Sequence, residues 1–199
     1  MENYETYKYS KIGLRLNVGV HPVTVGMYRE YCLAANVKMP LTPEFGWKTL
    51  HPIVNVSWHD AISYCKWVQD TYQDDVRLPL LSEWTIASRG GLSPIIAHYP
   101  WGDEYIDECT WTSVKIKKSG TAPVSRTHNT FLNGYGLLDV SGNVSEWLYD
   151  SKPDTFNKRY TTGSWYSRER TAGHCDSCND QSANYKSNFL GFRLVTIDR

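Results

Sequence analysis

Large aromatic side chains are the feature that most constrains how this 199-residue chain can fold. The sequence has eight Trp and fourteen Tyr but only a modest supply of Leu, Ile and Val. Each large ring buries a large apolar area when it packs, so rings can replace an aliphatic core. With 41% hydrophobic residues the chain is long enough to bury the core of one sizeable domain. We therefore expect a single ring-filled core with long irregular segments around it.

The charge balance gives no indication of the partner. Lys and Arg together number 21, as do Asp and Glu. This balance gives no electrostatic reason to expect binding to nucleic acid or to an anionic membrane. No run approaches the roughly 20 apolar residues of a membrane span, and the start lacks the basic and apolar regions of a signal peptide. We expect cytoplasmic synthesis without membrane insertion. Association with a virion or a cell surface by another route would leave no signal here.

The cysteines do not form a pattern typical of a disulfide scaffold. Their number is odd and the chain is of medium length, which favours reduced thiols. They stand at positions 32, 65, 109, 175 and 178.

Hydrophobic spacing predicts strands within residues 1–20 and an amphipathic helix over 23–35. Ser57 followed by Asp60 has the form of a capping box and predicts a second helix, with Cys65 on its apolar face. A third, short helix is expected from Ser82 to the glycines at 90 and 91. A strand at 193–195 closes the chain.

Several segments taken together resemble the formylglycine-generating-enzyme family, also called the sulfatase-modifying-factor family. They occur in the family's order and cover residues 20–195. The segments are 51–58, 64–67, 77–84, 99–103, 136–147, 163–165 and 191–195. The resemblance implies an α+β, C-type-lectin-like fold over residues 1–199. Two main helices, small twisted antiparallel sheets and long loops are expected.

Most motif residues are interpreted as structural. Rings are expected to pack in the core at Trp58, Trp67, Trp84, Trp101, Trp147 and Trp165. Hydrogen-bonded support of the loops is expected of Arg77, Glu83, Asp103 and Arg193. The two Asn-x-Ser sequons, at Asn55 and Asn143, lie inside these motifs and are interpreted in the same way.

The copper chemistry of the family is not expected. Its enzymes hold copper(I) with two cysteines after a Gly-Ser-aromatic turn, and a soft ion of this kind favours thiolates. The matching positions here are Ser167 and Ala172, so no catalytic residue is assigned. The nearby Cys175 and Cys178 leave open a displaced pair, a redox CxxC or half of a zinc site. The six histidines lack the local spacing of an iron site.

A structural calcium ion is the one cofactor for which the resemblance leaves room. Similar family members hold calcium in the segment that corresponds to residues 139–146. Two carboxylates with backbone carbonyls are oxygen ligands that suit Ca²⁺. The second calcium loop of the family corresponds to 113–118, which is basic here. The candidate ligands are Asp139 and Glu146 by side chain, and Val140, Gly142 and Val144 by carbonyl.

Residues 166–189 are the segment expected to carry the function. They contain no Leu, Ile, Val, Met, Pro or Trp and lie between two strong motifs. Tyr, Arg, Ser, Asn, Asp and His are typical of adaptable binding surfaces. The arrangement resembles the variable proteins of diversity-generating retroelements, which suggests a phage, virus or prokaryote source. The predicted contact residues are Tyr166, Ser167, Arg168, Arg170, His174, Asp176, Asn179, Asp180, Asn184, Tyr185, Asn188 and Phe189.

The sequence therefore predicts a non-catalytic protein that recognises a protein or a cell-surface ligand. The mechanism would be shape and hydrogen-bond complementarity on a rigid scaffold. Two alternatives stay open. One is a divergent oxidoreductase of the family acting on a peptide or small thiol, and the other is a structural or assembly protein without a ligand.

Overall fold

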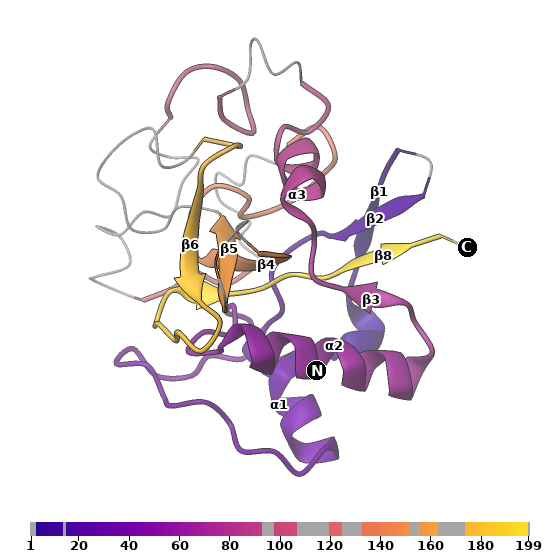
Figure 1. Ribbon diagram of the computed structural model, residues 1–199, viewed down its shortest axis with the longest axis vertical. Coiled ribbons are helices and arrows are strands. Elements are labelled where there is room, and N and C mark those ends of the chain that lie inside the picture. Colours follow the sequence, from indigo (N-terminus) through magenta and orange to yellow (C-terminus); the bar gives the residue numbers. More distant parts are fainter. Residues whose placement is uncertain are drawn as a thin grey trace.

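The computed structural model describes residues 3–13, 15–92, 98–106, 120–124, 133–151, 155, 157–162 and 174–198. Its regular elements form two small sheets with helices beside them (Figure 1). No helix in these ranges is long and apolar enough to span a bilayer.

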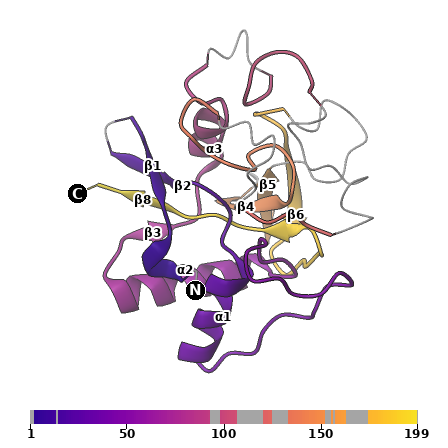
Figure 2. The same cartoon turned by 180° about the vertical axis from the view of Figure 1, so that it is seen from behind.

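The first sheet joins the two ends of the described chain. Its strand order is β1 (Tyr9–Ile12), β2 (Leu16–Gly19), β8 (Val195–Ile197) and β3 (Val76–Arg77), and every pair is antiparallel. The strands predicted within 1–20 are confirmed, whereas the strand predicted at 193–195 begins only at Val195 and continues to Ile197. Figure 2 shows β8 running between β2 and β3 from behind.

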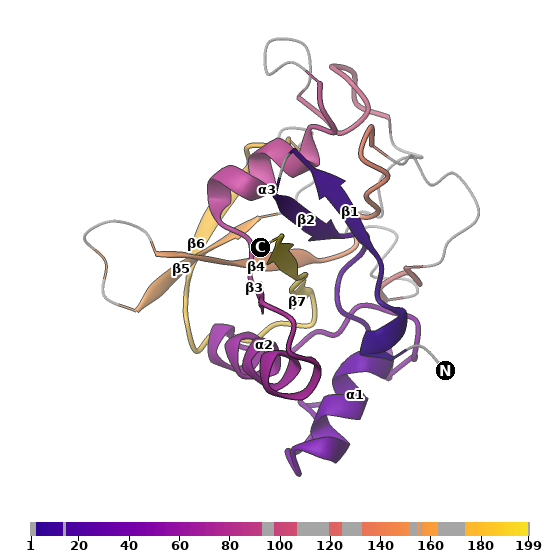
Figure 3. The same cartoon turned by 90° about the vertical axis from the view of Figure 1, so that its right-hand side faces the viewer.

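Three helices form where capping and spacing predicted them. They are α1 (Val25–Ala34), α2 (Trp58–Tyr72) and α3 (Leu81–Ser88), and a short 3₁₀ helix covers Tyr4–Thr6. Thr24 caps α1 through the backbone N–H of Met27. Ser57 and Asp60 form the predicted capping box of α2. Figure 3 shows α1 and α2 together on one side of the molecule and α3 on the other side of the first sheet.

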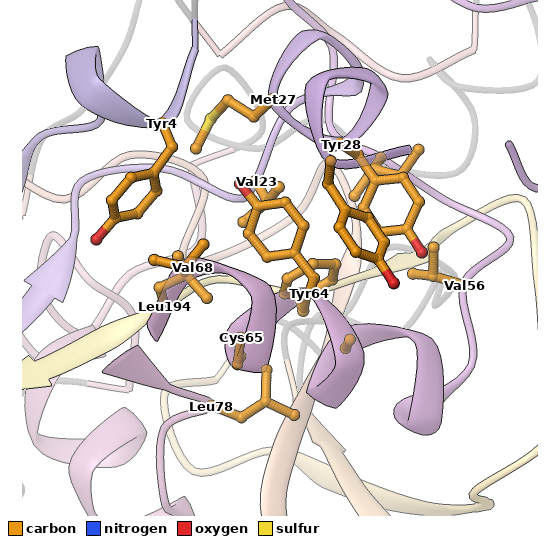
Figure 4. Packing of buried hydrophobic residues seen from close by; sticks show 14 of the residues in the cluster. Tyr4, Val23, Met27, Tyr28, Val56, Tyr64, Cys65, Val68, Leu78 and Leu194 are labelled. Carbon is orange, nitrogen blue, oxygen red and sulfur yellow. The ribbon is translucent and has the colours of Figure 1, made fainter. Parts of the chain in front are cut away.

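A ring-rich core lies between α1, α2 and the C-terminal segment (Figure 4). Tyr28 and Tyr64 stack at 5.6 Å between ring centroids, and Phe192 meets Tyr64 edge-on at 5.4 Å. Cys65 faces this core, as its place on the helix predicted. Trp84 and Trp147 are fully buried as expected, whereas Trp58, Trp67 and Trp101 are only partly buried. Trp165 lies outside the described residues.

The second sheet carries the candidate site. Its order is β6 (Cys178–Ser182), β5 (Lys158–Thr162), β4 (Ser145–Ser151) and β7 (Leu190–Gly191). Pairs β6–β5 and β5–β4 are antiparallel, as expected, but β4 and β7 are parallel. The parallel pair arises because the chain returns beside the start of β4 before Phe192 enters the core.

A buried ion pair fastens the second sheet to the first. Arg193 and Glu146 are both fully buried, and two nitrogens of the guanidinium, Nε and Nη2, each donate to a separate carboxylate oxygen at 2.8 Å. The same guanidinium donates to the carbonyls of Gly19 and Leu138. This arrangement confirms the structural interpretation of Arg193.

A second predicted support joins β3 to α3. Arg77 donates to both carboxylate oxygens of Glu83, at 2.7 and 2.6 Å, and Glu83 also accepts from the backbone N–H of Leu80. Asp103 lies 3.3 Å from His98 on the surface.

Candidate functional site

The predicted recognition segment is more regular than its composition indicates. Its described part, 174–189, includes the five-residue strand β6 and two buried side chains, Cys175 and Ala183. The segment therefore contributes these two side chains to the buried interior, which its polar composition does not indicate. Both are small, so composition alone hides their role. Four predicted contact residues, Tyr166, Ser167, Arg168 and Arg170, lie outside the described residues. Ala172, which with Ser167 matches the family's copper-binding cysteines, also lies outside them.

The N-terminal end of the segment is fixed to α3 and to the loop that follows it. Cys175 N–H donates to the carbonyl of His98 at 2.8 Å, and the Ser88 hydroxyl donates to the carbonyl of Cys175 at 3.1 Å. Arg89 reaches the carboxylate of the exposed Asp176 at 3.0 Å. This end of the segment is thus held by three separate contacts.

An aromatic cluster surrounds His174 at this end. The rings of His98 and His174 stack at 4.8 Å, and Tyr99 meets His174 edge-on at 4.9 Å. Tyr99 in turn stacks on Trp101 at 5.5 Å. Burial, together with the positive charge that His98 can carry, lowers the pKa of His174 from 6.5. The lowered pKa favours the neutral ring, and the ring contacts place His174 in a packed aromatic cluster.

Strand β6 separates two of the predicted contact residues onto opposite faces of the sheet. Asn179 is exposed and shares a face with Gln181, which lies opposite Arg159 of β5. Asp180 faces the other way and binds Lys158 at 2.6 Å. A strand of this length separates its two ends by roughly 13 Å. The predicted residues therefore do not form one compact patch.

The C-terminal end of the segment presents Tyr185, the most exposed aromatic residue among the predicted contact residues that the structure describes. Tyr185 is 46% exposed in the turn after β6, next to the exposed Asn184. Lys186 binds Asp60 of the α2 cap at 2.6 Å. The backbone N–H of Trp58 donates to the carbonyl of Ala183 at 3.0 Å, which fixes the turn to the start of α2.

The last two predicted contact residues support the segment more than they face solvent. The Asn188 side-chain oxygen accepts from Asn55 at 2.7 Å, and the ring of Phe189 lies 6.5 Å from that of Phe45. Both are partly buried. The bond from Asn55 also supports the structural interpretation of its sequon.

Sequence reasoning missed three residues beside the segment. Trp58, Tyr149 and Arg159 gather where α2, β4 and β5 meet, and Arg159 lies over the ring of Trp58 at 4.4 Å. Tyr149 lies 6.3 Å from Trp58 and is 48% exposed. Tyr149 and Arg159 lie 91 and 101 residues after Trp58, and no spacing rule joins positions so far apart in the sequence. The partial exposure of a motif tryptophan could be found only in three dimensions.

Of the two neighbouring cysteines, Cys175 has the character of a packed core residue. Neither Cys175 nor Cys178 forms a disulfide, and the first is buried whereas the second is exposed. Burial raises the pKa of Cys175 to about 11. A reactive cysteine needs its thiolate at neutral pH, which this environment disfavours. Within the described ranges, no cluster of three His, Cys, Asp or Glu side chains is placed to hold a metal ion.

Three of the predicted calcium ligands, Asp139, Gly142 and Glu146, already accept hydrogen bonds. Asp139 accepts from the Asn143 side chain at 3.0 Å, while both carboxylate oxygens of Glu146 accept from Arg193. The carbonyl of Gly142 accepts from the N–H of Val144. Glu146 does not fit a calcium site in this arrangement, because a cation there would lie against a buried guanidinium. Calcium binding stays a prediction, with Asp139 and the carbonyls of Val140, Gly142 and Val144 as the remaining ligands.

Comparison with known proteins identifies the class. The family model of the sulfatase-modifying factor enzyme 1-like domain matches residues 14–197. The chain belongs to this family, which confirms the resemblance and its α+β, C-type-lectin-like fold.

Curated relatives include both active and inactive proteins. A formylglycine-generating enzyme of Thermomonospora curvata is 37% identical over 63% of this chain and 39% of its own length. The inactive C-alpha-formylglycine-generating enzyme 2 of Mus musculus is 35% identical over 73% of this chain and 49% of its own. The chain thus spans about half or less of the length of these relatives, so their activities do not transfer directly.

Three solved structures illustrate the fold that this chain shares. Treponema denticola variable protein 1 superposes with a TM-score of 0.75 at 17% identity, covering 96% of this chain and 91% of its own. PvdO from Pseudomonas aeruginosa gives 0.76 at 20% identity, covering 92% and 80%. The Major Tropism Determinant U1 variant gives 0.54 at 12% identity, covering 95% and 52%. At sequence identities this low, the structural likeness shows a shared fold and does not show a shared function.

Proposed function

We propose that this protein is a non-catalytic recognition protein whose ligand is a protein or a cell-surface molecule. The observation that carries the proposal is the construction of segment 174–189. Both of its ends and its buried Ala183 are fixed to the framework, whereas Asn179, Asn184 and Tyr185 project outward. Pre-organised backbone with exposed Tyr and Asn side chains lowers the entropy lost on binding.

Two comparisons support this function. One structure of the same fold is named a variable protein and another a tropism determinant. Diversification of 166–189, as in diversity-generating retroelements, is part of the proposal. It would change the exposed side chains while the framework contacts stay the same.

The test uses a phage-displayed library of random peptides selected against the wild-type chain. Each selected clone is then measured against the double variant Asn179→Ala with Tyr185→Ala. The matched control carries Leu33→Ala and Leu41→Ala, two exposed residues near α1. We expect most clones to lose about tenfold or more in affinity for the double variant and to keep their affinity for the control. Clones that bind all three proteins equally would contradict the proposal.

Because some relatives are enzymes, a second candidate function is that of an oxidoreductase acting on a peptide or small thiol. It would need copper(I) held by two thiolates, and Ser167 and Ala172 stand at the matching positions. A copper(I) titration against a chelator tests it. Tight binding of one equivalent, with oxygen consumption in the presence of a thiol peptide, would favour the enzyme.

A further inference from the structure

The partly exposed patch of Trp58, Tyr149 and Arg159 is built as a rigid unit. The indole N–H of Trp58 donates to the carbonyl of Leu148 at 2.9 Å, and this bond fixes the ring. Arg159 lies over the ring at 4.4 Å from its centroid, and Tyr149 flanks it. Trp, Tyr and Arg are the residue types that contribute most binding energy at protein interfaces.

The guanidinium of Arg159 differs from the other well-placed arginines of this structure. Arg77, Arg89 and Arg193 each bind a carboxylate. Within the described part of the chain, Arg159 has the Trp58 ring and the carbonyl of Lys158 as its partners, and its Nε is buried without a hydrogen bond. A guanidinium carries five N–H donors, and leaving them without acceptors in a partly buried place is unfavourable.

Among the described residues near the patch, the two lysines are paired with carboxylates. Lys186 pairs with Asp60 beside the start of α2, and Lys158 pairs with Asp180 on the opposite face of the sheet. His59 is exposed on the same turn of α2, and its ring meets Trp58 edge-on at 5.3 Å. In the part of the chain that the structure describes, Arg159 is therefore the cation of the patch without a carboxylate partner, and its charge is the one that an incoming group would compensate.

The patch is continuous with the recognition segment. Arg159 lies opposite Gln181 in the β5–β6 register, and Asn179 is on the same face two residues along β6. On the other side, Trp58 holds the turn at Ala183. A ligand seated on Asn179 and the turn after β6 would thus lie next to Arg159.

We propose that Arg159 binds an Asp or Glu side chain of the partner, with Trp58 and Tyr149 packing against an apolar neighbour in the same peptide. This inference rests on the proposed function and names the chemistry of the partner. A planar carboxylate matches the outer amino groups of a guanidinium, and such charge-assisted bonds are among the stronger ones in proteins.

The test compares two selections from one phage-displayed library of random peptides, against the wild type and against Arg159→Gln. We expect Asp or Glu to be enriched at one position only in the wild-type selection. Binders of the wild type should lose about tenfold in affinity for Arg159→Gln, in line with a charged hydrogen bond. Lys158→Gln is the matched control, because this neighbouring cation lies on the opposite face, and it should keep both the enrichment and the affinity.

Equal acidic content in the two selections, unchanged affinity of the binders for Arg159→Gln, or no binder of the wild type would overturn the inference. Failure of the proposed function has a different signature. Peptides would then depend on Arg159 but not on Asn179 or Tyr185, which would place a binding site on the patch alone.

Discussion

The centre around Arg193 and the segment 174–189 are held in opposite ways. At the centre, one guanidinium binds the buried carboxylate of Glu146 in β4 and donates to the carbonyls of Gly19 in β2 and of Leu138, so both side chains of this pair are committed to the fold. Along the segment, backbone groups, small buried residues and the ion pairs of Asp176 and Lys186 make the framework contacts, while the exposed side chains of Asn179, Asn184 and Tyr185 take no part in them. The difference teaches that a segment can be fixed in place without fixing the identity of its exposed residues.

The largest effect is expected at the centre. Arg193→Met would leave Glu146 buried without its partner, and removing one member of a buried pair costs about 3–5 kcal/mol. Unfolding by urea, followed by far-ultraviolet circular dichroism, measures the free energy of unfolding. A loss below about 1 kcal/mol would mean that the pair is not the central support described here.

Ala183 tests whether the segment has framework positions of its own. Ala183→Leu would overfill a fully buried site beside the start of α2, at a cost of about 1–3 kcal/mol. The neighbouring Asn184→Leu is the control, since its side chain is exposed and surface changes usually stay within about 0.5 kcal/mol. Equal effects of the two substitutions would remove the distinction between buried and displayed positions.

The framework pair of Arg77 and Glu83 should respond to acid. Burial alone would raise the pKa of Glu83, but the bonds from Arg77 and Leu80 outweigh it and lower the pKa below 4.5. A lowered pKa stabilises the fold above 4.5 and loses that contribution as the pH falls through the folded-state value. The stability difference between wild type and Glu83→Gln should therefore be larger at pH 7 than at pH 3. A difference that stays constant over this range would show that the pair does not couple protonation to folding.

The smallest change in stability is expected at the displayed positions. Tyr185→Ala removes a half-exposed ring that the framework contacts do not use, so the free energy of unfolding should change by less than about 0.5 kcal/mol. Thermal unfolding of the wild type and the variant measures this directly. A marked drop in melting temperature would assign Tyr185 to the framework.

Sequence reasoning found the framework because capping and spacing are local signals. Ser57 with Asp60 located the start of α2, and the apolar face predicted the burial of Cys65. Family motifs led to the interpretation of Arg193 as a support. Local signals could not show that Glu146 is its partner, because the two lie 47 residues apart.

The candidate site was predicted as a segment but not as a surface. Composition identified 166–189 as polar, yet strand pairing decides that Asn179 and Asp180 face opposite sides. Burial of Cys175 and Ala183 depends on α3 and α2. The patch at Trp58 and Arg159 depends on the meeting of α2 with β5. These are long-range contacts, which no local pattern encodes.

The most direct test of the displayed-segment account is to sequence this gene and its flanking DNA in closely related isolates. The account predicts that amino-acid changes gather within 166–189, at exposed positions such as Asn179, Asn184 and Tyr185, and match adenines in a nearby template copy. It also predicts that the buried Cys175 and Ala183 stay constant or change only to small residues. If 166–189 is as constant as the framework segment 51–58, the segment is not a diversified recognition surface.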